Sequence, residues 1–183
     1  MHALLLIVLS SLVAASSAFA SEAGNGPRIR PQDDRITAML AAGVARSASF
    51  RALVDRIEAS DVFVYVGMSP LLKSTLAGRL SWMTKAGGYR YLRAAISTGL
   101  SSDRIISSLA HELQHVVEVI EDSSVVDEKT LVTLYKRIGE PSRASVSVAW
   151  ETIAAQEVAS RVRRELREQP VTLALRVTTS DKL

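Results

Sequence analysis

The pattern of apolar and polar residues changes its period several times along the chain. Residues 33–58 place apolar side chains at helical spacing, and Gly43 indicates two helices or one interrupted helix. Residues 61–67 (DVFVYVG) are β-branched and aromatic, which predicts a strand. Residues 76–97 predict two strands joined as a hairpin around residues 86–88, where two glycines follow an alanine.

Helical spacing returns in the second half. It predicts a helix over residues 101–122, another around residues 131–138 and a last helix over roughly residues 148–168. Residues 21–32 predict an extended lead-in, and residues 171–177 either an edge strand or a loose tail. The expected fold is α+β. A short antiparallel sheet packs against the helix of residues 101–122 and further helices, in a single domain over residues 33–183.

The first twenty residues carry no Asp, Glu, Lys or Arg. Their apolar core, residues 3–15, is shorter than the ~20 residues that a membrane-spanning helix needs. The stretch ends in Ala18-Phe19-Ala20, an A-x-A pattern typical of a signal-peptide cleavage site. We therefore expect an exported protein, periplasmic or secreted, with no stable membrane span once the signal is removed.

The amino-acid composition limits the metal ligands and the binding partners that the chain can use. The chain has no cysteine, so neither disulfides nor thiolate ligands are available. The net charge of +3 is modest, and the basic cluster at residues 161–168 is interleaved with acids, which favours a solvated helix face and no nucleic-acid partner. Removing the first 20 of 183 residues leaves 163 residues and two histidines, His111 and His115.

Both histidines lie in the sequence LAHELQHVVEV, residues 109–119. Residues four apart on a helix project from the same face, so His111 and His115 can bind one zinc ion through neutral imidazole nitrogens. Glu112 lies beside that face, where it can act as a general base without binding the metal. The pattern therefore points to a zinc site with a catalytic carboxylate.

The apolar residues of this helix gather on the opposite side. They are Ile106, Leu109, Leu113, Val116, Val117 and Ile120. This arrangement excludes histidines on an apolar core face and predicts that His111 and His115 face outward. The polar face has two interpretations, a cleft or an ordinary solvated surface.

Two glutamates are candidates for a third ligand. Glu118 lies one turn after His115, and helical side chains lean towards the N-terminus, so its carboxylate can brace His115 or bind the metal itself. Glu151 heads an apolar stripe on the last predicted helix that should pack inward, whereas Glu157 points towards neighbouring arginines. A buried glutamate needs a partner, which is either the metal or an arginine such as Arg79, Arg93 or Arg143. Glu151 is the preferred ligand.

HELQH, its uncharged surroundings and the downstream Glu151 resemble the HExxH zincins, in particular the gluzincin branch. The resemblance implies a zinc-activated water, Glu112 as general base, and His111, His115 and Glu151 as zinc ligands. It further implies a zinc-dependent hydrolase, most plausibly a metallopeptidase that acts on peptides or proteins. The alternative is a noncatalytic zinc-binding or envelope interaction domain on the same scaffold.

The sequence departs from this family in three places. Ala155 stands where gluzincins often carry an aspartate that braces a zinc histidine. The Asn-Ala motif of the substrate-binding edge strand is absent. No residue stands out as the stabiliser of an oxyanion, and Tyr89, Tyr91 and Tyr135 are candidates only by elimination.

Overall fold

The computed structural model describes residues 26–72, 76–141 and 150–169. The expected signal peptide and the tail of residues 171–177 lie outside these ranges. The elements are β1 (Ile29–Pro31), α2 (Asp34–Arg46), α3 (Ala48–Glu58), β2 (Val62–Ser69), β3 (Gly78–Ala86), β4 (Tyr89–Ser97), α4 (Ser102–Glu121), α5 (Glu128–Ile138), β5 (Glu140–Pro141), β6 (Trp150–Glu151) and α6 (Ile153–Glu168). The fold is therefore mixed α+β, as the sequence predicted.

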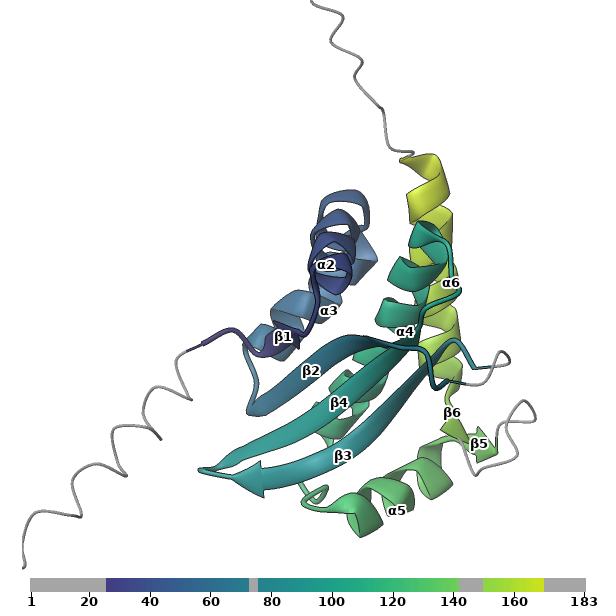
Figure 1. Cartoon of the computed structure of the whole chain (residues 1–183). Helices are drawn as coiled ribbons and strands as arrows, with labels where there is room; N and C mark the ends of the chain where they lie inside the picture. The colour runs from purple at the N-terminus through teal and green to yellow at the C-terminus, as the bar shows by residue number, and fades with distance from the viewer. Residues whose placement is uncertain (1–25, 73–75, 142–149, 170–183) are drawn as a thin grey trace, which may run out of the picture.

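The main sheet has the order β1-β2-β4-β3 and is mixed (Figure 1). β2 pairs in parallel with both β1 and β4, and β3 pairs with β4 in the antiparallel direction. The prediction of an antiparallel sheet was wrong. The lead-in contributes β1, and α2 and α3 form the crossover that lets β1 and β2 run in parallel. β4 then enters the sheet between β2 and β3, so β3 becomes an edge strand.

The two predicted local features of the first half are present. β3 and β4 form a hairpin around Gly87 and Gly88, whose φ angles of 58° and 83° suit the tight turns that join twisted strands. Residues 33–58 form two helices, because Ser47 adopts an extended conformation between them. The Ser47 hydroxyl then accepts a hydrogen bond from the Phe50 N–H and caps α3.

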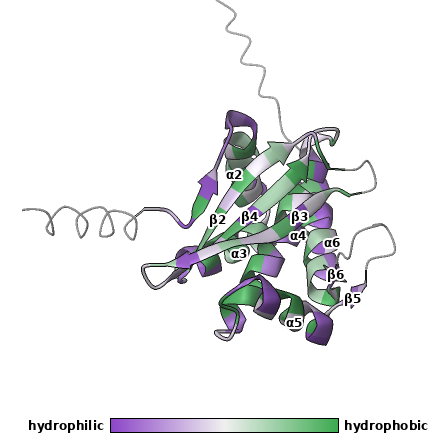
Figure 2. Ribbon diagram, turned by 60° about the horizontal axis from the view of Figure 1, so that its bottom comes forward, coloured by the Kyte–Doolittle hydropathy of each residue, from purple (hydrophilic) through white to green (hydrophobic). Residues whose placement is uncertain are grey.

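Helices cover one face of the sheet, with α4 packed against its centre and α6 beside α4 (Figures 1 and 2). The inward residues of the two central strands are fully buried against these helices; they are Val62, Val64, Val66, Leu92, Ala94 and Ile96. On the other face, the Phe63 ring stacks with Tyr91, and the guanidinium groups of Arg28 and Arg30 lie 4.4 and 4.2 Å from its centre. None of the helices in the described ranges is long and apolar enough to cross a membrane.

The last helix begins later than the sequence predicted. Thr152 is the N-cap of α6, and its hydroxyl accepts a hydrogen bond from the Ala155 N–H. Glu151 therefore lies before the helix, in the two-residue strand β6, where it pairs with Glu140 of β5. The helix buries Ala155, Ala159, Val162 and Leu166, and it leaves Glu157 exposed.

A buried arginine fastens the C-terminal end of α4 to the sheet. The Arg90 guanidinium donates two hydrogen bonds to the Asp61 carboxylate, at 2.8 and 2.7 Å, and two more to the backbone carbonyls of Val119 and Asp122. Only 3% of Arg90 is exposed. Each donor therefore replaces lost hydration with a protein acceptor, as a buried charge requires.

We expect Arg90→Met to lower the free energy of unfolding by about 2–4 kcal/mol, because two helix-end carbonyls and the Asp61 carboxylate lose their donor. Urea denaturation measures the change. Arg93→Met, on the same strand but with an exposed side chain, is the control and should change stability by less than ~0.5 kcal/mol. Equal stability of the two variants would contradict the structural role of Arg90.

Candidate metal centre

Helix α4 is buried on its polar face as well as its apolar face. The exposed fractions of Glu112, His115 and Glu118 are 4, 5 and 6%. α6 lies beside α4, with β6 just before its first turn (Figure 1), and Glu151 of β6 contacts His111. The solvated-surface interpretation and the expectation of outward-facing histidines were therefore wrong for His115. The His111 side chain retains 18% exposure and lies at the mouth of a cavity.

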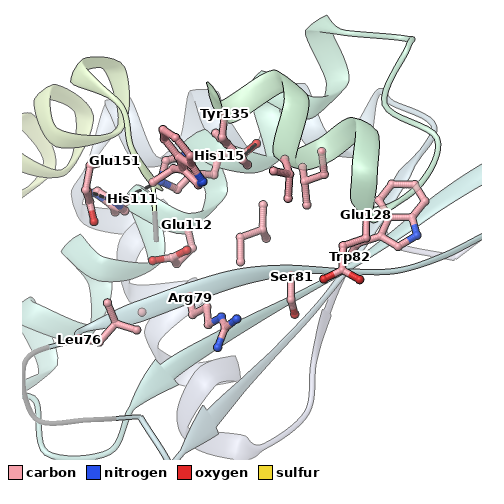
Figure 3. Close-up of a pocket in the computed structure, with 15 residues that line it drawn as sticks. Leu76, Arg79, Ser81, Trp82, His111, Glu112, His115, Glu128, Tyr135 and Glu151 are labelled. Atoms are coloured by element: carbon pink, nitrogen blue, oxygen red, sulfur yellow. Dashed lines mark hydrogen bonds and ion pairs between the residues drawn. The ribbon is translucent and has the colours of Figure 1, made fainter. Parts of the chain in front are cut away.

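Three potential ligand atoms converge at this place. His111 Nε2 lies 3.2 Å from His115 Nε2 and 3.1 Å from Glu151 Oε2 (Figure 3). The ligand atoms of the three residues lie within 4.8 Å of one another. Tetrahedral zinc with bonds of 2.0–2.1 Å spaces its ligands by about 3.3 Å, which the two distances from His111 match, so the three residues could hold a metal ion. The ion pair of Glu151 is with His111, and neither Arg79 nor Arg93 pairs with it; Arg143 lies outside the described residues.

The electrostatics of these groups are strongly coupled. Burial alone would lower the pKa of His111, but the hydrogen bond to Glu151 and the nearby carboxylates prevail and raise it. The same hydrogen bond with His111 lowers the pKa of Glu151, against the effect of its partial burial. The carboxylates thus favour a positive charge at this point. A proton can supply that charge, and so can a divalent cation.

Glu118 faces away from the three converging atoms. Its Oε2 lies 2.8 Å from Nδ1 of His115, and its Oε1 accepts a hydrogen bond of 2.5 Å from the Thr152 hydroxyl. A hydrogen bond at Nδ1 directs the Nε2 lone pair towards His111 and Glu151. Glu118 therefore orients the His115 ring through Nδ1 and lies apart from the three converging atoms.

Thr152 is a site residue that the sequence reasoning missed. Its hydroxyl caps α6 and holds Glu118, and the residue directly before it is Glu151. A threonine ahead of an apolar helical stripe is a helix-start pattern, so its capping role was readable from the sequence. Its contact with Glu118 was not, because the two are 34 residues apart and meet only through the packing of α6 on α4.

Glu112 points from α4 towards the start of β3 (Figure 3). Burial raises the pKa of its carboxyl group, while the two histidines and the Leu80 N–H act in the opposite direction. A Cβ atom placed on Gly78 would collide with the Glu112 carboxyl group. Glycine at this position therefore allows Glu112 to lie directly against β3.

A cavity of about 170 Å³ opens beside Glu112 and both histidines. β3 and α5 form its walls, with Trp82, Leu131, Val132 and Tyr135 as its larger apolar contributors. The Tyr135 hydroxyl donates a hydrogen bond of 3.2 Å to the His115 carbonyl, and burial raises its pKa well above 10.0. Tyr89 and Tyr91 instead pack against Phe63 on the far face of the sheet, which leaves Tyr135 as the tyrosine at the site.

Comparisons with known proteins give no assignment. No protein-family model matches the chain, and neither the curated proteins nor the solved structures contain a significant match to it.

The hydrogen bonds from Thr152 to Glu118 and between Glu118 and His115 should strengthen metal binding, although neither Glu118 nor Thr152 is a ligand. We expect Glu118→Ala and Thr152→Val each to weaken zinc binding about 10- to 100-fold, the usual effect of removing a partner of a metal ligand. Thr152→Ser keeps the hydroxyl and should restore affinity. Competition with a chromogenic chelator measures these changes, and exposed Glu157→Ala is the control. Loss of zinc in Glu118→Ala as complete as in Glu151→Ala would make Glu118 a ligand instead.

Proposed function

We propose that the protein is an exported zinc-dependent hydrolase, and specifically a metallopeptidase. The observation that carries this proposal is the convergence of His111, His115 and Glu151 beside the buried carboxylate of Glu112. Two neutral imidazoles, one carboxylate and room for a further ligand form the donor set of a catalytic zinc site. The cavity next to these groups gives a substrate access to them.

A zinc ion at this site would supply a Lewis acid that polarises a carbonyl group and lowers the pKa of water. Glu112 is placed to accept the proton of an attacking water and to pass it to the leaving nitrogen. Tyr135 keeps its proton at neutral pH and can donate to a developing oxyanion if its hydroxyl turns from the His115 carbonyl.

The edge strand β3 supports a peptide as the substrate. Within the described strands, β3 is paired on one side only, by β4. Residues 78–82 of β3 line the cavity, immediately beside Glu112. An extended peptide can add to such an edge through main-chain hydrogen bonds, which would bring its carbonyl groups past the site. This geometry favours a chain of amide bonds over a compact small molecule.

The proposal is tested with purified mature protein. We expect close to one zinc per chain by elemental analysis and hydrolysis of an unbiased peptide library. Glu112→Gln should keep the zinc but reduce cleavage at least about 100-fold, because the proton acceptor is lost. Protein that binds no zinc after reconstitution at neutral pH would refute the proposal. Zinc binding without any cleavage would favour a noncatalytic zinc-binding domain.

Gly78→Ala provides a second test of the role of Glu112. The added methyl group would displace the Glu112 carboxyl group, and none of the three ligands is among the atoms nearest to it. We expect cleavage to fall about 100-fold, as a displacement of ~1 Å can cause, with zinc affinity little changed. Gly99→Ala is the matched control, since its Cβ would enter open space. Wild-type cleavage by Gly78→Ala would mean that Glu112 is not the base.

A further inference from the structure

A second cavity of about 200 Å³ lies next to the same site. It shares Leu76, Gly78, His111, Glu112 and Glu151 with the first cavity, so His111 and Glu151 of the candidate ligands lie between the two. The rest of its wall comes from α4, α6 and the residue before β3, and consists of small side chains and one cation. These residues are Ala77, Ser107, Ser108, Ala159 and Arg163.

The two cavities differ in chemistry. The first is bordered by the large apolar side chains of Trp82, Leu131 and Val132, with Arg79 and Glu128 as further charged contributors. The second has no aromatic residue in its wall, and its largest side chain beyond those that it shares is Arg163. A substrate that runs past His111 would therefore meet large apolar side chains on one side of the cleaved bond, and small side chains with Arg163 on the other.

Arg163 is available to bind a ligand. It lies on the exposed side of α6, and within residues 26–72, 76–141 and 150–169 it has no hydrogen bond or ion pair. The two carboxylates of this cavity are already engaged, Glu151 with His111 and Glu112 with the Leu80 N–H. The N–H groups of the Arg163 guanidinium thus have no acceptor within the cavity, and their planar arrangement suits a carboxylate.

We propose that Arg163 binds a carboxylate of the substrate, so that the site prefers peptides with a negative charge on the side of the cleaved bond that occupies the second cavity. This inference rests on the proposed hydrolase function. The carboxylate belongs either to the C-terminus of the peptide or to an Asp or Glu side chain. The small residues of the wall leave room for such a group but offer little surface to a large apolar one.

The experiment compares cleavage of four pools of random hexapeptides by the zinc-loaded protein. The pools have a free or an amidated C-terminus, each with or without Asp and Glu. We expect the wild type to prefer one carboxylate source, and the pool that is preferred identifies it. Arg163→Ala should lower kcat/KM for that pool about tenfold, the lower end for a lost charge-assisted hydrogen bond. Arg163→Glu should invert the preference towards peptides with lysine.

Arg164→Ala is the matched control, because Arg164 is the next residue of α6 and does not line the cavity. It should retain the wild-type preference. A second readout is independent of turnover: in the Glu112→Gln background, the preferred pool should bind more weakly when Arg163 is replaced by Ala, as measured by calorimetry.

The outcomes separate the two proposals. Cleavage without any preference for a carboxylate, or equal behaviour of the Arg163 and Arg164 variants, would overturn this inference and leave the hydrolase function standing. Absence of cleavage from zinc-loaded wild type refutes the hydrolase function. Absence of any Arg163-dependent binding in the Glu112→Gln background refutes the inference on its own.

Discussion

The structure depends on the burial of both faces of helix α4. Its apolar side forms the core with the sheet, and its polar side lies beneath α6 and β6. A buried polar group without a partner costs about 1–3 kcal/mol, so each group on this side must find one. Within the described ranges, every buried side-chain nitrogen and oxygen has a hydrogen-bond partner. The pairs of His115 with Glu118 and of Glu118 with Thr152 follow from that requirement.

The same constraint explains why the centre suits a cation. The Nε2 atoms of His111 and His115 lie 3.2 Å apart, and two lone pairs at this distance repel unless a proton or a metal ion lies between them. Glu118 forms a hydrogen bond with Nδ1 of His115, so Nε2 is the ring nitrogen that can bind a metal ion. Glu151 adds a negative charge on the same side. The fold thus concentrates electron-rich atoms where a divalent ion would be most stabilised.

Much of this arrangement was readable from local sequence patterns. The period of apolar residues predicted α4, the strand at residues 61–67 and the hairpin with its two glycines. The spacing of His111 and His115 predicted their shared face, because four residues on one helix fix that geometry. The structure places Glu151 beside both histidines, as the sequence argument expected, although from a short strand and not from a helix. Its identity as a ligand stays a prediction.

The features that were missed depend on contacts between distant segments. β1 has only three residues and no strong strand pattern, so its parallel pairing with β2 followed from the α2–α3 crossover and not from its sequence. His115 packs against the Tyr135 ring of α5, and its partner Glu118 is held by Thr152 at the start of α6, contacts that leave no periodic pattern on α4 itself. Local periodicity identifies one buried face of a helix, and the second appears only in three dimensions.

The central claim is that His111, His115 and Glu151 bind zinc together. An anomalous-difference map, collected above and below the zinc absorption edge from crystals of the zinc-loaded protein, tests this claim most directly. We expect a single strong peak about 2.0–2.2 Å from Nε2 of both histidines and from a Glu151 carboxylate oxygen. A peak bound by Glu118 in place of Glu151, or no peak between the histidines, would contradict this account.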